Sequence, residues 1–375
     1  MKKILIIAFS DLSKDPRVRR QIIALKGSYT ISALGYENPN IEGVEFIKVQ
    51  KIKWTLWKKV YQRVLLLIKA YDKVYNTLSY VIEAKENLKE INRFDLVIVN
   101  DIEPLPLVID LNMKKCIVDL HEYAPKQYED DFWWKFYFSK FKHYLCTKYL
   151  KKANYITTVS NGLRDEYQKE YNIKCEVFMS LPSFNNLVPS NVTQKIKLIH
   201  HGLVSRNRSL HLLIEMMDHV DERFELDLML VLGQKDYFEE LKNMAKIRKN
   251  VNIIPSVNYE DIIPFTNNYD MGVYILPPTN FNTKYMLPNK FFEFIQARLA
   301  IAIGPSLEME QLVRKHNLGI VSESFKPEDL ALLLNNLTNS EIINYKSNVD
   351  KTASILNSEV NSLKLNQIVS ELLND

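Results

Sequence analysis

Short apolar runs alternate with amphipathic stretches along almost the whole chain, and this alternation limits the possible folds more than any other feature. Most runs have the length of one strand, about four to eight residues, and the stretches between them have helical spacing. Such an alternation predicts parallel sheets covered by helices on both faces. The expected strands are 4–9, 29–35, 44–49, 96–99, 116–120, 155–159, 196–202, 226–233, 251–255, 271–276 and 299–304.

A stretch rich in proline, asparagine and serine, residues 181–195, interrupts the alternation and has the composition of a linker. The 375 residues suffice for two domains. We therefore expect an α/β protein of two doubly wound, Rossmann-like domains, residues 1–183 and 184–350, and a C-terminal helix over 351–375 that could pack back on the first. Ligands of such sheets bind at the carboxyl ends of the strands, so a cleft between the domains is expected.

Composition narrows the classes of function. A hydrophobic share of 46% and a charged share of 25% are ordinary for a soluble globular protein. The net charge of +4 is small and its basic residues are dispersed, which argues against a nucleic-acid binder. The three cysteines lie far apart, so we expect buried free thiols and neither a disulfide framework nor a zinc site.

Two segments, residues 53–91 and 127–150, have helical spacing with many aromatic and basic residues. The first predicts one long helix or two shorter ones. Both segments could be core helices with solvated basic faces. Alternatively, residues 53–75 and 132–150 form a surface that contacts anionic lipid. No apolar run is long enough to predict a membrane span.

Cations crowd two expected helix starts in the second domain. Lys290 opens a helix over 290–297, after Asn289 as the expected N-cap. Arg208 opens a helix over 208–218, after the strand that ends in Gly202. A helix N-terminus disfavours a cation and binds an anion. Two such starts, each downstream of a strand, predict one shared anion, and a diphosphate fits.

Glu293 lies on the same helix face as Lys290, at i and i+3. It could accept hydrogen bonds from sugar hydroxyls. The alternative is an ordinary surface pair of a lysine and a glutamate.

Six short motifs, in this order, resemble retaining GT-B glycosyltransferases of the family 4 type, and the resemblance covers nearly the whole chain. The motifs are DPRVRRQ (15–21), VNDIEPLP (99–106), VDLHEY (118–123), TTVSNGL (157–163), HGLVSRNRSL (201–210) and LPNKFFEFIQA (287–297). The resemblance implies a nucleotide-sugar donor on the second domain. Arg208 and Lys290 would hold its diphosphate, and Glu293 its ribose.

The resemblance also assigns residues of the first domain. His121 matches a histidine that points at the donor sugar, although a core histidine is the alternative, and Glu122 could pair with it. Asp15 and Arg17 are expected to line the donor or acceptor cleft. Asp101 follows a strand, and either lines the cleft or caps a helix over 102–110.

The sequence departs from the family at two positions. Tyr285 stands where relatives often carry a second glutamate near the donor sugar, so donor choice is least certain there. Arg298 replaces the glycine that usually follows the helix, which should cost cap stability.

The expected activity is transfer of a hexosyl or N-acetylhexosaminyl group from a nucleoside diphosphate, UDP by preference, to a hydroxyl of a lipid-linked or polysaccharide acceptor of a bacterial surface polymer, with retention. His121, Arg208 and Lys290 are the expected catalytic residues. No metal or other cofactor is expected, because no D-x-D motif ends a strand and cations can stabilise the leaving group.

Two other functions remain open at this point. One is a UDP-sugar epimerase of similar fold, and the other is an inactive scaffold subunit of a glycosyltransferase complex. The expected location is the cytoplasm, including the inner face of the cytoplasmic membrane.

Overall fold

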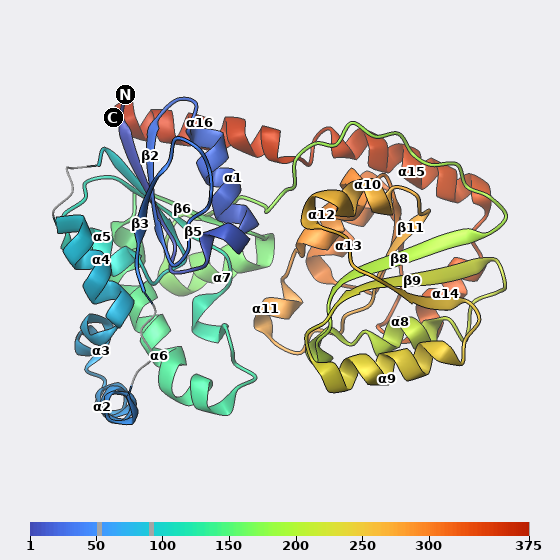
Figure 1. Cartoon of the computed structure of the whole chain (residues 1–375), viewed down its shortest axis with the longest axis horizontal. Coiled ribbons are helices and arrows are strands. Elements are labelled where there is room, and N and C mark those ends of the chain that lie inside the picture. The colour runs from blue at the N-terminus through green and yellow to red at the C-terminus, as the bar shows by residue number, and fades with distance from the viewer. Residues whose placement is uncertain (51–54, 90–93, 375) are drawn as a thin grey trace. The chain divides into compact units, whose positions relative to one another are not determined.

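The computed structural model describes residues 1–50, 55–89 and 94–374. They form two compact units (Figure 1). Unit 1 consists of Met1–Ser180, Asn280–Asn282 and the C-terminal segment that begins at Asn361. Unit 2 consists of Leu181–Thr279 and Thr283–Val360. The chain passes from unit 1 to unit 2 at the start of the predicted linker.

Unit 1 contains a seven-stranded sheet of order β3-β2-β1-β4-β5-β6-β7, in which every pairing is parallel. Six of its strands coincide with predicted runs, and the two-residue β7 is too short to give a periodic signal. The strands are β1 (Lys3–Ile7), β2 (Thr30–Gly35), β3 (Glu45–Lys48), β4 (Leu96–Asn100), β5 (Cys116–Leu120), β6 (Tyr155–Thr158) and β7 (Glu176–Val177). The helices of this unit are α1 (Pro16–Leu25), α2 (Leu56–Leu67), α3 (Tyr71–Thr77), α4 (Ser79–Lys89), α5 (Leu105–Asp110), α6 (Phe132–Tyr149) and α7 (Asn161–Tyr171).

Unit 2 contains a six-stranded sheet of order β10-β9-β8-β11-β12-β13, again with parallel pairings throughout. Its strands are β8 (Ile196–Leu203), β9 (Phe224–Val231), β10 (Val251–Ile254), β11 (Met271–Tyr274), β12 (Ala300–Ile303) and β13 (Gly319–Val321). Its helices are α8 (His211–Met216), α9 (Lys235–Lys246), α10 (Ile262–Thr266), α12 (Asn289–Gln296), α13 (Leu307–His316), α14 (Pro327–Asn335) and α15 (Asn339–Ala353). Two further helices, α11 (Phe281–Lys284) and α16 (Ser358–Asn374), have residues in both units.

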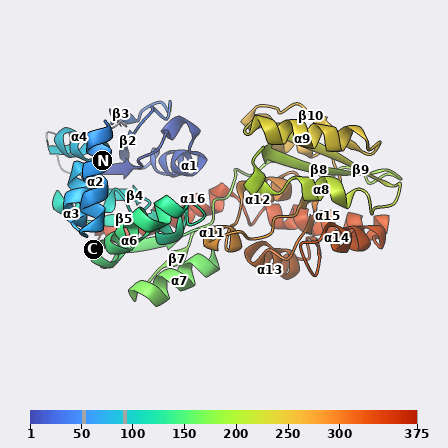
Figure 2. The ribbon, with the colours of Figure 1, turned by 90° about the horizontal axis from the view of Figure 1, so that it is seen from below.

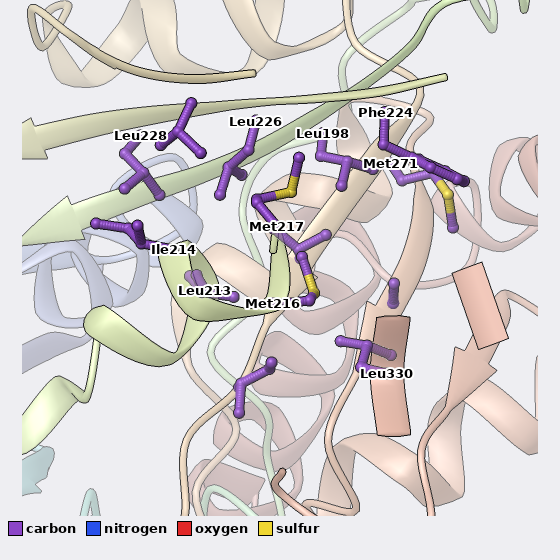
Figure 3. Close-up of a cluster of buried hydrophobic side chains, with 14 of the residues drawn as sticks. Leu198, Leu213, Ile214, Met216, Met217, Phe224, Leu226, Leu228, Met271 and Leu330 are labelled. Atoms are coloured by element: carbon purple, nitrogen blue, oxygen red, sulfur yellow. The ribbon is translucent and has the colours of Figure 1, made fainter. Parts of the chain in front are cut away.

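The core of unit 2 shows why the strand runs are apolar throughout. Leu213 and Met216 of α8 and Leu330 of α14 are fully buried and belong to one cluster with the strand residues Leu198 and Leu226 (Figure 3). A strand with both faces covered has no solvent side, so its residues do not alternate between apolar and polar. The predicted parallel, doubly covered sheets are therefore confirmed.

Helix α12 packs closely on this sheet because β11 carries a glycine. An ideal Cβ on Gly272 would lie only 2.4 Å from the ring of Phe294. Any larger residue at position 272 would push the helix away from the strand. This contact sets how close α12, and with it Lys290 and Glu293, lies to the sheet.

Several expected helix starts are wrong, and local backbone geometry explains each. Asp101 has a φ of 65° and does not cap a helix over 102–110, because α5 begins only after Pro104. The chain at Arg206–Arg208 forms a 3₁₀ turn that ends at Ser209 with a φ of 47°, so α8 begins three residues after Arg208. A left-handed residue interrupts α-helical dihedrals in both places.

The first expected helical segment divides into α2, α3 and α4, one more helix than predicted. Lys69, with a φ of 57°, separates the first two of these. The ends of that predicted segment, residues 53–54 and 90–91, lie outside the described residues.

The two ends of α12 also differ from expectation. Pro288, held extended at φ −72° and ψ 145°, occupies the N-cap position, so Asn289 is the first helical residue instead of the cap. Arg298 follows the helix at a φ of 62°, where glycine is usual. Its buried guanidinium donates to Asp350 Oδ1 at 2.6 Å and to the Asn185 carbonyl at 2.7 Å. These bonds offset the backbone cost.

Candidate functional site

Strand β8 carries two adjacent buried histidines near its carboxyl end, His200 and His201, and the first of them contacts Lys290. Nδ1 of His200 lies 2.8 Å from the carbonyl oxygen of Val273 on the neighbouring β11. Burial and the charge of Lys290 lower the pKa of His200 well below its ordinary value, so the ring is neutral. Nδ1 must then donate to the carbonyl, and Nε2 accepts a hydrogen bond from Lys290 Nζ at 2.9 Å.

Lys290 is therefore positioned by a group that does not neutralise it. The side chain is half-buried, and its Nζ lies 5.2 Å from the centre of the Tyr274 ring. Within the described part of the chain, no carboxylate lies within ion-pair distance of this ammonium. Burial and the charge of Arg208 lower the pKa of Lys290 to about 7, against an opposing effect of Glu293. A half-buried cation without a counter-charge can accept an external anion.

Arg208 is the second cation at this end of the sheet. Its proximity is shown by its effects on the pKa of Lys290 and on the pKa of Tyr274, which burial raises and Arg208 lowers. Arg208 forms no ion pair with any described carboxylate. Arg206, two residues earlier, does the opposite: its guanidinium lies 3.2 Å from Asp236 and 2.8 Å from Glu240. Only the later arginine remains for a ligand.

Gly202 leaves room for the lysine. It has a φ of 144°, and an ideal Cβ would lie 2.8 Å from Lys290 Nζ. Replacing Gly202 with alanine should therefore displace the ammonium from His200. Because small displacements of a positioned group cost up to about 100-fold in rate, we expect a ten- to 100-fold loss of the sugar transfer that the sequence predicts.

The measurement for this substitution is donor turnover together with the melting temperature. The control is Gly27→Ala, since no atom lies within 4 Å of an ideal Cβ at Gly27. An unchanged turnover in Gly202→Ala would contradict the role given to Lys290.

Glu293 lies one turn further along α12 and is buried, with a relative exposure of 5%. Its Oε2 lies 3.4 Å from Nε2 of His201, the second histidine of β8, in a geometry that does not make a hydrogen bond. Burial and Lys290 lower the pKa of His201 to about 3, so this contact is not an ion pair. The carboxylate is therefore not neutralised by His201. The alternative of an ordinary surface pair with Lys290 is wrong.

Unit 1 has a buried polar network near the carboxyl ends of its central strands. Arg17 of α1 binds Asp119 of β5 through two bonds of 2.6 Å, and both side chains are more than nine-tenths buried. Gln21 adds a bond of 2.7 Å to Asp119, and Thr157 adds one of 2.8 Å. The structure thus places Arg17 in an internal ion pair.

His121 follows β5 and joins this network. Its Nε2 lies 3.0 Å from Oδ1 of Asn100 and 3.7 Å from Asp119, and its Nδ1 lies 3.8 Å from Asp101. Burial alone would lower the pKa of His121, but Asp101 and Asp119 outweigh it and raise the pKa. The carboxylates in ion-pair contact with the ring are those of the two aspartates, and the charge of His121 also lowers the pKa of Glu122.

The other predicted residues have these positions. Asp15 caps α1, accepting from the amide of Val18 at 3.1 Å. Asp101 accepts from the backbone amide of His121 at 3.0 Å. Burial and Asp101 raise the pKa of Glu122 to about 7. Tyr285 follows α11 in unit 2, with Lys284 over its ring at 5.2 Å. The predicted site residues before Leu181 thus lie in unit 1, and Tyr285 lies with Arg208, Lys290 and Glu293 in unit 2.

Sequence reasoning missed three residues that organise these sites. His200 and His201 lie within a predicted strand and were given no role, although two histidines at the end of an apolar run are unusual. Asp119 stood within another such run, CIVDL. A charge in a strand covered on both faces requires a partner, and that signal was available in the sequence, although it did not say which residue the partner is.

The comparisons with known proteins bear on the fold. No family model matches the sequence, and no curated protein matches it either. Among solved structures, the chain is similar to Anabaena HepE in complex with UDP-glucose, with a TM-score of 0.72 and 12% identity over 99% of this chain and 100% of that one. It is also similar to sucrose-phosphate synthase from Thermosynechococcus elongatus, with a TM-score of 0.75 and 12% identity over the full length of both chains.

A third similar structure is WaaG, a glycosyltransferase involved in lipopolysaccharide biosynthesis, with a TM-score of 0.67 and 12% identity over 97% of this chain and 99% of that one. The two parallel sheets of this chain and its likeness to these full-length structures lead to one conclusion. The chain has the GT-B fold, the two-domain architecture of the glycosyltransferases that it resembles.

Proposed function

We propose that this protein is a glycosyltransferase that moves a hexosyl or N-acetylhexosaminyl group from a UDP-sugar to a hydroxyl of a lipid-linked or polysaccharide acceptor. One observation carries the proposal: Arg208 and Lys290, at one end of the unit 2 sheet, are cations without carboxylate partners among the described residues. A diphosphate supplies the missing charge. The likeness to HepE, which was solved with UDP-glucose, supports the choice of nucleotide.

The same two cations suit the chemistry of the leaving group. Negative charge grows on the diphosphate as the glycosidic bond breaks, and positioned cations in a partly desolvated site stabilise that charge. We propose on this basis that the transfer needs no metal. The resemblance to retaining family 4 enzymes leads us to propose retention as well. Glu293 would accept hydrogen bonds from the ribose hydroxyls. His121 would act at the donor sugar, with Asn100 bonding Nε2 of its ring and Asp101 lying 3.8 Å from its Nδ1.

The first test is a calorimetric titration of the full chain with UDP, GDP and ADP, followed by donor turnover with UDP-sugars in the presence and absence of EDTA. We expect binding of UDP, turnover that EDTA does not reduce, and retention of anomeric configuration by NMR. Absence of binding by every nucleoside diphosphate would refute the proposal. Binding without turnover on any donor would favour the scaffold function.

The affinity for UDP should depend on pH through Lys290. With a pKa of about 7, this lysine is charged below neutrality and loses its proton as the pH rises. A bound diphosphate favours the charged form, so binding at about pH 8 should take up a proton and weaken toward about pH 9. Above about pH 7 the diphosphate itself is almost fully ionised, so its own titration adds little.

Proton uptake is measured by titration calorimetry in two buffers of different ionisation enthalpy. The matched variant is Lys290→Arg, because arginine keeps its charge throughout this range. Its binding should show no proton uptake. A wild type that behaves like this variant would refute the lowered pKa.

A further inference from the structure

Helix α2 exposes apolar side chains along most of its length. Of its residues, only Leu65 and Leu66 are buried. The exposed apolar residues are Leu56, Trp57, Val60, Tyr61, Val64, Leu67 and, just after the helix, Ile68. At about 100° per residue, these seven fall on one arc about 140° wide, opposite the side that packs on the protein. Trp57 is 84% exposed.

Basic residues border this arc on both sides. Lys59 and Arg63 lie along one edge, and Lys58 lies along the other. Helix α2 contains no acidic residue. Among the described residues, none of these three cations forms an ion pair. An apolar arc between two basic edges is the pattern of a helix lying in a membrane interface.

The first turns of α6 extend the same surface. Phe132, Trp133 and Phe136 are exposed by 69%, 63% and 52%, whereas the second half of α6 is anchored by Phe141 and Leu145 in the core. Helices α2 and α6 lie side by side in both views (Figures 1 and 2), and Arg63 lies 5.6 Å from the ring centre of Tyr137. Helix α6 also has no acidic residue.

We propose that this surface, defined by the exposed apolar residues of α2 and by Phe132, Trp133 and Phe136 of α6, docks unit 1 on an anionic lipid bilayer. None of the helices in the described ranges has the length and apolarity needed to cross a membrane. The contact is therefore interfacial: aromatic and aliphatic side chains enter the headgroup region, and the flanking cations meet lipid phosphates.

Charge favours lipid over a second copy of the chain. A two-fold interface would bring the same surface, with its unpaired cations, against itself. Like charges facing each other disfavour association, and lysine is depleted in protein interfaces. An anionic bilayer instead attracts every one of these cations. This inference does not depend on the proposed transferase activity, because it rests on a different surface of unit 1.

The test is flotation of the full chain with vesicles, without any nucleotide. Wild type should bind vesicles of phosphatidylglycerol mixed with phosphatidylcholine and should bind vesicles of phosphatidylcholine alone much more weakly. The triple variant Lys58→Gln, Lys59→Gln and Arg63→Gln should lose about fivefold in partitioning for each cation, on the order of 100-fold in total at low salt. Trp57→Ser with Trp133→Ser should also reduce binding strongly.

Matched controls come from unit 2. Lys235→Gln, Lys246→Gln and Lys249→Gln remove the same charge from exposed positions outside the surface. Ile247→Ser alone removes an apolar side chain that is 80% exposed. Both controls should bind as wild type does. Their melting temperatures, and those of the surface variants, should all stay near that of wild type.

Three outcomes would overturn the proposal. Wild type could fail to bind anionic vesicles, or the controls could lose as much binding as the surface variants. Alternatively, sedimentation could show a wild-type dimer that Trp57→Ser with Trp133→Ser dissociates, without vesicle binding. That last result would assign the surface to a second copy of the chain. None of these outcomes changes UDP binding, so they are distinguishable from failure of the proposed function.

Discussion

Arg208→Ala and Lys290→Met should each lower the rate of sugar transfer by about 100- to 1,000-fold, the usual effect of removing one group that stabilises charge in a transition state. Each substitution removes a cation that no described carboxylate neutralises. Affinity for UDP should fall as well, because the diphosphate is present in the ground state. The measurement is turnover of the UDP-sugar that the wild type uses, with UDP binding measured in parallel.

The chain offers a matched control for each variant. Arg206→Ala removes an arginine two residues away that is already paired with Asp236 and Glu240. Lys284→Met removes an exposed lysine from the neighbouring α11. Both controls should keep turnover within a few-fold of wild type. Equal losses in Arg206→Ala and Arg208→Ala would mean that turnover depends on positive charge in general. That result would contradict a specific role for Arg208.

Arg17→Met should destabilise unit 1 by about 3–5 kcal/mol, the range measured when one partner of a buried ion pair is removed. The substitution leaves the Asp119 carboxylate, which is 1% exposed, with an uncompensated charge. The free energy of unfolding is measured by urea denaturation, with signals that separate the two units. Arg17→Met with Asp119→Leu should recover much of the loss, because no charge is then buried. A double variant as unstable as the single one would contradict this account.

The same pair predicts a dependence of stability on acid. Burial alone would raise the pKa of Asp119, but Arg17 and His121 outweigh it and hold the pKa well below its ordinary value. A lowered pKa in the folded state contributes stability above the unfolded pKa of about 3.9, and this contribution is lost as the pH falls below that value. The difference in stability between wild type and Asp119→Asn should therefore shrink below about pH 4. A constant difference down to about pH 2 would contradict it.

The sequence predicted the sheets well because a buried strand is a local pattern. The run ILIIAF, for example, gives β1 to within two residues at each end. The short strands β7 and β13 were not predicted, because two or three residues are too few to form a recognisable apolar run. Helix starts were less predictable, since they depend on single backbone conformations. Asp101 and Ser209 adopt left-handed backbone conformations, which their residue types tolerate but do not predict.

The candidate site could be predicted only in part. The positions of Arg208 and Lys290 after strands indicated cations at a ligand-binding edge. The sequence did not show which arginine of RNR is free, because Asp236 and Glu240, which pair with Arg206, lie about thirty residues away. It also did not predict the partner of Arg17, because Asp119 lies 102 residues away in the sequence.

By itself, then, the sequence determined two doubly covered parallel sheets and the strand ends at which chemistry would gather. Those features follow from hydrophobic burial, which acts on every residue of a strand and leaves a continuous apolar run in the sequence. The tertiary structure decided which charges are already paired and which remain for a ligand. It brought the neutral His200 to Lys290, and Asp119 to Arg17, because contacts between side chains distant in sequence leave no local pattern.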